Sequence, residues 1–198
     1  MFHTLQKQLK KPSGLLGIIV AKMMERRNRK YYYKVIQEME IRNGDKILEI
    51  GYGPGDGIEL FARNYDCQIT GIDFSELMYK KASERNKKYI DSGKVHLKYG
   101  DLLNADLGIE KFDKVVCLNV VYFWNDLNEA FKKIISLLND GGMYFIYMAS
   151  AEQLTQLGAD KEFARYSIDQ VESALKQTGF NSIEYKNEGG FYIKARKH

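Results

Sequence analysis

The chain has little cysteine, little proline and no long apolar run. Two of its 198 residues are cysteine and two are proline. Cys67 and Cys117 both lie in apolar, strand-like stretches, which argues against a disulfide framework and against a zinc site. We therefore expect no metal centre and a reducing, cytoplasmic environment. The longest apolar run, residues 15–21, contains Gly17 and is far too short to span a bilayer.

Acidic residues are almost missing from the N-terminal part. Residues 1–34 contain nine Lys or Arg but only one acid, Glu25, a net charge of +8, whereas the whole chain carries +4. The first eleven residues are polar and basic, without the apolar segment of a signal peptide. The asymmetry indicates either an anionic partner or a solvated helix face.

The most informative segment is residues 46–57, which read KILEIGYGPGDG. A short buried strand comes first, glycine follows at every second position from Gly51 to Gly55, and an apolar helix begins near Ile58. A strand, a glycine turn and a helix N-terminus together indicate a nucleotide-binding loop, because glycine lets the backbone approach a ligand closely.

The spacing of these glycines argues against a dinucleotide. The G-x-G-x-x-G fingerprint fails in both registers, since its last position falls on Asp56 or on Ile58. Asp56 also stands at the helix N-terminus, where its carboxylate would repel a pyrophosphate. The loop therefore suits a nucleoside without phosphates.

Strands and helices alternate along the rest of the chain, which predicts one α/β domain with a parallel sheet covered on both faces. Strands are predicted at residues 47–50, 68–72, 95–98, 112–119, 143–148, 180–185 and 191–195. Helices are predicted at residues 18–39 (one long or two short), from 58, and at 75–89, 127–138 and 168–178. Residues 188–190 form the turn of a closing hairpin.

The pattern Glu49-x-Gly51-x-Gly53-x-Gly55 after a strand resembles motif I of the class I S-adenosylmethionine (SAM) dependent methyltransferases. The resemblance extends over residues 44–195, with the motifs in the family order. It implies a doubly wound, Rossmann-like sheet of seven mostly parallel strands with a C-terminal antiparallel hairpin. Residues 1–43 would be an N-terminal helical cap and residues 44–198 the SAM-binding domain. Pro12-Ser-Gly14, residues 23–28 and the aromatic stretch 122–124 resemble a group of small, uncharacterised bacterial methyltransferases.

The resemblance also implies roles for residues in binding SAM, or its product S-adenosylhomocysteine. Gly51, Gly53 and Gly55 would pack against the cofactor, and Glu49 would hold its amino group, directly or through water. Asp73, after the second strand, would accept hydrogen bonds from both ribose hydroxyls; its alternative role is a helix N-cap, for which Ser75 competes. The remaining cofactor contacts would come from Phe74, Met78, Asp101, Leu102, Asn119 and Val120, the last two through their backbone.

The sequence argues against several classes of methyl acceptor. Residues 119–122 read NVVY and lack the two prolines of enzymes that methylate nucleobase amino groups. Cys117 lies within the fourth strand, so a pyrimidine-carbon mechanism lacks its nucleophile, and two cysteines are too few for arsenic methylation. Only about twenty residues separate the fifth strand from the last helix. We therefore expect a small-molecule acceptor and no stable nucleic-acid partner.

The predicted acceptor pocket is rich in aromatic side chains, which suggests an amine or an aromatic acceptor. A general base is needed only if the acceptor is protonated at working pH, so the sequence identifies no catalytic residue. The candidates for the pocket are Tyr122, Phe123, Trp124, Tyr147, Met148, Arg165 and Tyr166, with His3, Asn28 and Tyr31 to Tyr33 from the N-terminal segment.

Three alternatives stay open. The acceptor is a lipid head group if the basic N-terminal segment, with its neighbours Leu15 to Val20, contacts an anionic membrane. The protein is a non-catalytic SAM-binding module if it binds the cofactor without turnover. A tRNA-binding enzyme is a weaker option that rests on the basic N-terminus alone. The oligomeric state does not follow from the sequence.

Overall fold

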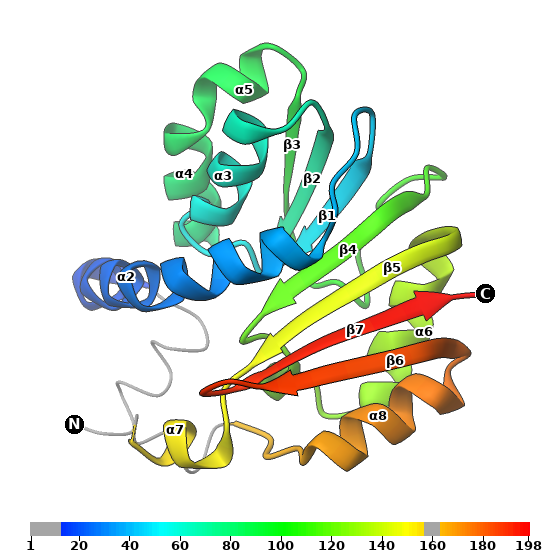
Figure 1. The fold of residues 1–198 in the computed structure, drawn as a ribbon. Helices are drawn as coiled ribbons and strands as arrows, with labels where there is room; N and C mark the ends of the chain where they lie inside the picture. Colours follow the sequence, from blue (N-terminus) through cyan, green and yellow to red (C-terminus); the bar gives the residue numbers. More distant parts are fainter. Residues whose placement is uncertain (1–12, 157–162) are drawn as a thin grey trace.

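The computed structural model describes residues 13–156 and 163–198, which form a seven-stranded sheet with helices on both faces (Figure 1). The strand order is β3-β2-β1-β4-β5-β7-β6. The strands are β1 (Lys46–Ile50), β2 (Gln68–Asp73), β3 (Val95–Tyr99), β4 (Phe112–Leu118), β5 (Leu138–Met148), β6 (Phe180–Asn187) and β7 (Phe191–Lys197). Strands β1 to β5 pair in parallel, whereas β7 is antiparallel to both β5 and β6. The predicted fold class is confirmed.

Two layers of helices enclose the sheet (Figure 1). Helices α2 to α5 cover one face, and α6 and α8 cover the other. The helices are α2 (Gly14–Glu38), α3 (Asp56–Asn64), α4 (Glu76–Arg85), α5 (Lys87–Asp91), α6 (Leu127–Leu137), α7 (Ala151–Gln156), α8 (Ile168–Gln177) and the single 3-10 turn η1 (Val121–Phe123).

Strand β4 shows why the sheet needs both layers. Val115 and Cys117 pack into the core below α6 and α8, whereas Val116 and Leu118 pack into the core shared with α2 and α3. Successive strand residues point to opposite faces, so a strand buried on both sides reads as one continuous apolar run.

Some element boundaries differ from the prediction. Residues 14–38 form one continuous helix, and the helix predicted at 75–89 is two helices that meet at Asn86, whose buried amide donates to the Gly55 and Ala82 carbonyls. Strand β5 begins at Leu138, five residues before the predicted start, because Leu138 already pairs with Phe112 of β4. A register shift follows, and the pairing continues from Met143. The short elements η1 and α7 carry no apolar periodicity and were missed.

The topology creates a crevice between β1 and β4. The connection after β1 leads to β2 on one side, and the connection after β4 leads to β5 on the other side. Ligands of doubly wound proteins bind outside the carboxyl ends of the strands at such a switch point. Helix α2 packs beside this crevice through Tyr31, Tyr32, Val35, Ile36 and Met39, which join the core of β1 and α3. None of the helices in the described ranges is long and apolar enough to cross a membrane.

Candidate active site

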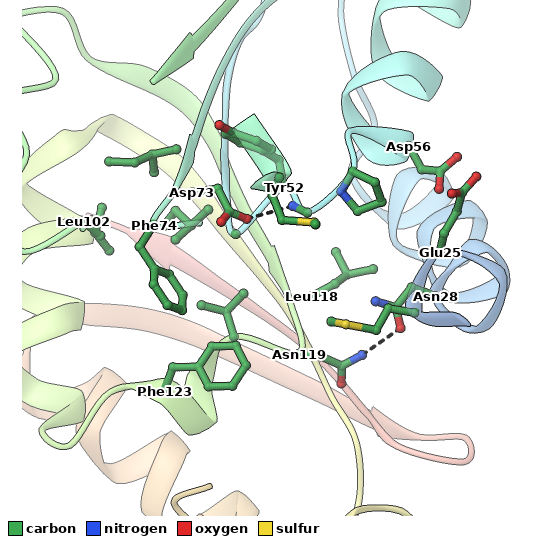
Figure 2. A pocket seen from close by; sticks show the side chains of 18 of the residues that line it. Glu25, Asn28, Tyr52, Asp56, Asp73, Phe74, Leu102, Leu118, Asn119 and Phe123 are labelled. Carbon is green, nitrogen blue, oxygen red and sulfur yellow. Dashed lines mark hydrogen bonds between the residues drawn. The ribbon is translucent and has the colours of Figure 1, made fainter. Parts of the chain in front are cut away.

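A cavity of about 300 Å³ lies at the carboxyl ends of β1 to β4, beside α2 (Figure 2). Its wall combines segments that are far apart in the sequence. The predicted site residues that line it are Asn28, Tyr32, Gly51, Gly53, Asp73, Phe74, Met78, Asp101, Leu102, Asn119, Val120, Phe123 and Trp124.

Two glycines of the loop after β1 have no room for a side chain. Gly51 has a φ of 71°, and a Cβ built on it would lie 2.5 Å from the Val120 Cγ2 atom. Gly55, the N-cap of α3, has a φ of 85°, and its Cβ would lie 2.9 Å from the Ala82 backbone. Left-handed φ and close backbone approach both require glycine. Gly55 therefore shapes the loop without lining the cavity.

Asp73 is held by the backbone around it. Its Oδ2 accepts a hydrogen bond from the Gly53 N–H at 2.9 Å and its Oδ1 accepts one from the Ser75 N–H at 2.8 Å. Burial raises the pKa of this carboxyl to about 6, although the two backbone bonds act to lower it. The N-cap of α4 is Ser75 and not Asp73, because the Ser75 Oγ accepts from the Met78 N–H at 3.4 Å. Asp73 is thus fixed at the cavity wall beside the loop.

Glu49 is completely buried and does not line the cavity. The Tyr32 hydroxyl donates to its Oε1 at 2.5 Å, and its Oε2 has no hydrogen-bond partner among the described residues. Desolvation raises the pKa of Glu49 to about 8, assisted by the nearby carboxylates of Asp56 and Asp73 and opposed by the Tyr32 hydrogen bond. The sequence placed Glu49 in the site but did not reveal its hydrogen bond to Tyr32, which does line the cavity.

One end of the cavity is apolar. Phe74, Met78 and Leu102 line it, and the Phe74 ring makes an edge contact with Phe123, with centroids 6.1 Å apart. Asp101 lies nearby on the surface, and its Oδ1 accepts from the Leu103 N–H at 2.8 Å. This combination of apolar faces and one carboxylate suits a flat heterocycle with an amino group.

Asn119 adopts a left-handed conformation with a φ of 58°, a conformation that Asn tolerates better than most residues. Its Nδ2 donates to the Asn28 Oδ1 at 3.1 Å (Figure 2). Its Oδ1 accepts from the Ala149 N–H at 3.2 Å and from the Tyr122 hydroxyl at 3.2 Å. The sequence predicted only a backbone role here, whereas the side chain joins α2 to the ends of β4 and β5.

A charged cluster at the cavity rim was not predicted. Arg85 lies 2.8 Å from both Asp56 and Glu25, which line the cavity, and so joins α4 to α3 and α2. Desolvation raises the pKa of Asp56, and Arg85 opposes this shift. Glu25 and Arg85 are about 60 residues apart with no recognisable motif around either, so sequence offered no signal for the pair.

A second, smaller cavity of about 50 Å³ adjoins the first. Met24, Asn28, Asn119 and Phe123 line both cavities. The remaining lining of the small cavity is mostly apolar and comprises Met23, Arg27, Tyr122, Ala149, Leu154 and Phe163. Burial raises the pKa of Tyr122, so its hydroxyl stays protonated.

Some predicted pocket residues lie elsewhere. Tyr147 is fully buried behind the cavity, because its side chain leaves β5 on the face that packs against α2; it stacks on Tyr31 at 3.9 Å and donates to the Gly189 carbonyl. The Tyr166 hydroxyl donates to the Trp124 carbonyl at 2.7 Å, and Arg165 donates to Thr155. Tyr147, Met148, Arg165 and Tyr166 line neither cavity, Tyr33 is half exposed, and His3 lies outside the described residues.

Comparison with known proteins identifies the family. Residues 47–142 match the family model of a methyltransferase domain. The uncharacterized methyltransferase YdaC of Bacillus subtilis is 32% identical over 173 residues, which cover 86% of this chain and 91% of YdaC. The chain belongs to the methyltransferases. The predicted likeness to a small, uncharacterised bacterial type is confirmed.

More distant relatives share this methyltransferase fold. A sterol 24-C-methyltransferase of Candida albicans is 24% identical over 164 residues, 76% of this chain and 43% of that enzyme. The structure of phosphoethanolamine N-methyltransferase 2 from Haemonchus contortus, in complex with SAM, superposes with a TM-score of 0.75 and 19% identity, over 85% of this chain and 52% of the other. The chain spans about half the length of these two enzymes. Its sheet is that of the class I methyltransferases, a family that uses SAM as the methyl donor.

Proposed function

We propose that this methyltransferase binds SAM in the large cavity and transfers the methyl group to a small-molecule acceptor in the adjoining small cavity. The observation that carries the proposal is Asp73. Its carboxylate stands at the end of β2, next to β1, and is held at the cavity wall by two backbone N–H groups. A carboxylate in this position can accept hydrogen bonds from both hydroxyls of a ribose.

The rest of the large cavity fits the other parts of the cofactor. Phe74, Met78 and Leu102 offer apolar faces to an adenine ring, and Asp101 offers an acceptor for its amino group. At the opposite end, Gly51 lines the cavity and packs directly against Val120, because it has no side chain. Glu49 has a buried oxygen without a partner, and an ammonium group would satisfy it. The bound cofactor supplies an electrophilic methyl group together with its own leaving group.

The small cavity supports an apolar acceptor with a free lone pair. Its polar groups are Arg27, Asn28, Asn119 and Tyr122, and the raised pKa of Tyr122 makes this hydroxyl a donor rather than a base. Asn28 and Asn119 line both cavities, so they would orient the acceptor against the methyl donor. Catalysis would then rest on proximity and alignment. A neutral amine or a thiolate fits these conditions.

Calorimetric titration tests the cofactor assignment, with SAM and S-adenosylhomocysteine as ligands and NAD as the control. We expect micromolar binding of the first two and none of NAD. A folded protein that fails to bind SAM would contradict the proposal. Incubation of the protein and labelled SAM with amines, phenols and thiols then tests the acceptor class, and cofactor binding without turnover on any acceptor would favour a non-catalytic module.

A lipid head-group acceptor is the second candidate, and it is favoured by the exposed face of α2. Leu16, Ile19 and Met23 lie on one side of this helix and are 56%, 66% and 45% exposed. Arg26, Arg27 and Lys30 continue the same side. An apolar stretch followed by basic residues suits the interface of an anionic membrane.

Vesicle co-sedimentation tests this second candidate. We expect binding to phosphatidylserine vesicles that weakens in salt, and loss of binding in the double variant Leu16→Ser/Ile19→Ser. Ile109→Ser is the matched control, because Ile109 is 97% exposed and lies between β3 and β4, away from α2. Equal sedimentation of the double variant and the control would exclude α2 as the membrane contact.

A further inference from the structure

Helix α2 contacts the cavity through three polar side chains. Glu25 pairs with Arg85, Asn28 accepts from Asn119, and Tyr32 donates to Glu49. The third contact differs from the other two because its acceptor is completely buried. Tyr32 also lines the cavity, so it touches both the ligand space and the carboxyl group behind it.

The groups around Glu49 in the described part of the chain are acids, tyrosines and a cysteine. The titratable groups that face it are Tyr32 from α2, Tyr52 and Asp56 from the glycine loop and α3, Asp73 from β2 and Cys117 from β4. Among the described residues, no basic side chain forms an ion pair with Glu49. A buried carboxyl with one unpartnered oxygen and no cation is costly unless a ligand completes it.

The packing around this pair is tight. Gly57, at the start of α3, lies against both members, and a Cβ built on it would overlap the Tyr32 ring and lie 2.6 Å from the Glu49 Oε1 atom. The missing side chain at Gly57 is what lets Tyr32 and Glu49 pack against the start of α3. The Tyr32 hydroxyl and the Glu49 carboxyl are therefore held together by three elements at once, α2, β1 and α3.

We propose that Tyr32 is a positioning residue that, through Glu49, couples the docking of α2 to the binding of the cofactor's amino group. This inference rests on the placement of that amino group at Glu49 proposed above. The ammonium group binds the unpartnered Oε2 while the Tyr32 hydroxyl keeps Oε1. Binding converts the carboxyl into a carboxylate, and the proton that it loses goes to solvent.

The coupling has a physical basis in hydrogen-bond strength. A hydroxyl bonds more strongly to a carboxylate than to a neutral carboxyl group. When the ammonium group makes Glu49 ionise, the bond from Tyr32 strengthens and holds α2 more firmly. In the other direction, Tyr32 stabilises the carboxylate and so strengthens the binding of the ammonium group. Each event favours the other to the same extent, as linkage requires.

The first test is the affinity for S-adenosylhomocysteine between pH 6 and pH 8.5, for wild type and Tyr32→Phe. Because the pKa of Glu49 is raised to about 8, wild-type affinity should rise with pH and level off near pH 8. Tyr32→Phe should bind about tenfold more weakly at pH 7, and its affinity should still be rising at pH 8. Tyr31→Phe is the matched control, since Tyr31 is a neighbouring, equally buried tyrosine that faces Tyr147.

Two further measurements separate the parts of the proposal. In Glu49→Gln, which keeps an acceptor for Tyr32, the affinity should no longer rise with pH above pH 7, where Asp73 is already ionised. 5′-Methylthioadenosine, which keeps the nucleoside but lacks the amino group, should bind wild type with little dependence on pH above 7. Titrations in buffers of different ionisation enthalpy should report proton release for S-adenosylhomocysteine with wild type and none with Glu49→Gln.

The outcomes distinguish the two proposals. If Glu49→Gln binds as wild type does at every pH, the placement of the amino group at Glu49 is wrong. If Glu49→Gln removes the pH dependence but Tyr32→Phe and Tyr31→Phe weaken binding equally with unchanged profiles, the role of Tyr32 is only structural. Hydrogen exchange of α2 provides a last readout: S-adenosylhomocysteine should slow it in wild type, and this slowing should be lost in Tyr32→Phe.

Discussion

Two walls face the large cavity and differ in what holds their polar groups. In the strand wall, formed by the segments after β1, β2 and β3, Asp73 and Asp101 accept hydrogen bonds from three backbone N–H groups, which belong to near neighbours in the chain or to the glycine loop. In the helix wall, formed by Met24, Glu25, Asn28 and Tyr32 of α2, the polar groups bond to side chains up to 91 residues away.

This difference separates a preformed site from an assembled one. The strand wall exists as soon as the parallel sheet forms, because its geometry follows from strand ends and one tight loop. The helix wall exists only when α2 is docked, because each of its polar contacts crosses from one element to another. We therefore expect cofactor recognition to depend mainly on the strand wall, and adjustment of affinity and acceptor choice to depend on the helix wall.

The largest expected effect breaks the strand wall at Asp73. Asp73→Ala should weaken binding of S-adenosylhomocysteine by about 2–3 kcal/mol, because it removes two charge-assisted ribose bonds. The Gly53 N–H also loses its acceptor, which loosens the loop. Calorimetry measures the change, and Asp73→Asn, which keeps one acceptor oxygen, should lie between wild type and Ala. Binding of the Ala variant within twofold of wild type would refute the ribose placement.

The two buried acids also make stability depend on pH. The pKa of Glu49 is raised from 4.5 to about 8 and that of Asp73 from 3.8 to about 6. A folded-state pKa above the unfolded value gives stability that is present at low pH and lost as pH rises to the folded value. Without ligand, the free energy of unfolding should therefore fall steadily between pH 5 and pH 8, mainly through Glu49.

Urea denaturation across this pH range checks the linkage. Glu49→Gln should remove most of the decline, since an amide does not titrate, and saturating S-adenosylhomocysteine should also reduce it. Stability that rises over the same range in the ligand-free protein would show that Glu49 is ionised when the cavity is empty. The acid behind the helix wall would then be charged in the empty cavity, and the two walls would differ less in their electrostatics.

The strand wall was predictable from the sequence, and the helix wall only in part. Gly51, Gly53 and Asp73 follow buried strands at motif spacing, so the sequence indicated both their position and their neighbours. Asn28 and Tyr32 were predicted as pocket residues, but their bonds to Asn119 and Glu49 depend on how a 25-residue helix crosses the sheet. No periodicity or spacing encodes such a crossing.

The same reasoning explains the misplaced aromatic residues. Tyr147 was predicted to face the acceptor because it stands near the end of β5, but strand alternation turns it toward Tyr31 and Tyr192 instead. A strand buried on both faces reads as one apolar run, so the sequence does not tell which face each residue occupies. The roles of residues in the cavity remain predictions that the variants here are designed to test.

A smaller effect sharpens the view of the helix wall. Asn28→Ala should lower the free energy of unfolding by about 1 kcal/mol, because the half-buried Asn119 amide loses its acceptor. A double-mutant cycle with Asn119→Gly, which suits the left-handed φ, should give a coupling of about 0.5–1 kcal/mol. Additive effects of the two substitutions would mean that this contact does not hold α2 in place.

The smallest effect concerns Tyr166, which supports the end of the cavity from outside. Its hydroxyl donates to the Trp124 and Asn125 carbonyls but lines neither cavity. Tyr166→Phe should therefore lower the free energy of unfolding by about 0.5–1 kcal/mol and leave the affinity for S-adenosylhomocysteine unchanged. Denaturation and calorimetry on the same preparation separate the two effects. A loss of cofactor affinity beyond threefold would show that the segment after η1 forms a third wall of the binding site.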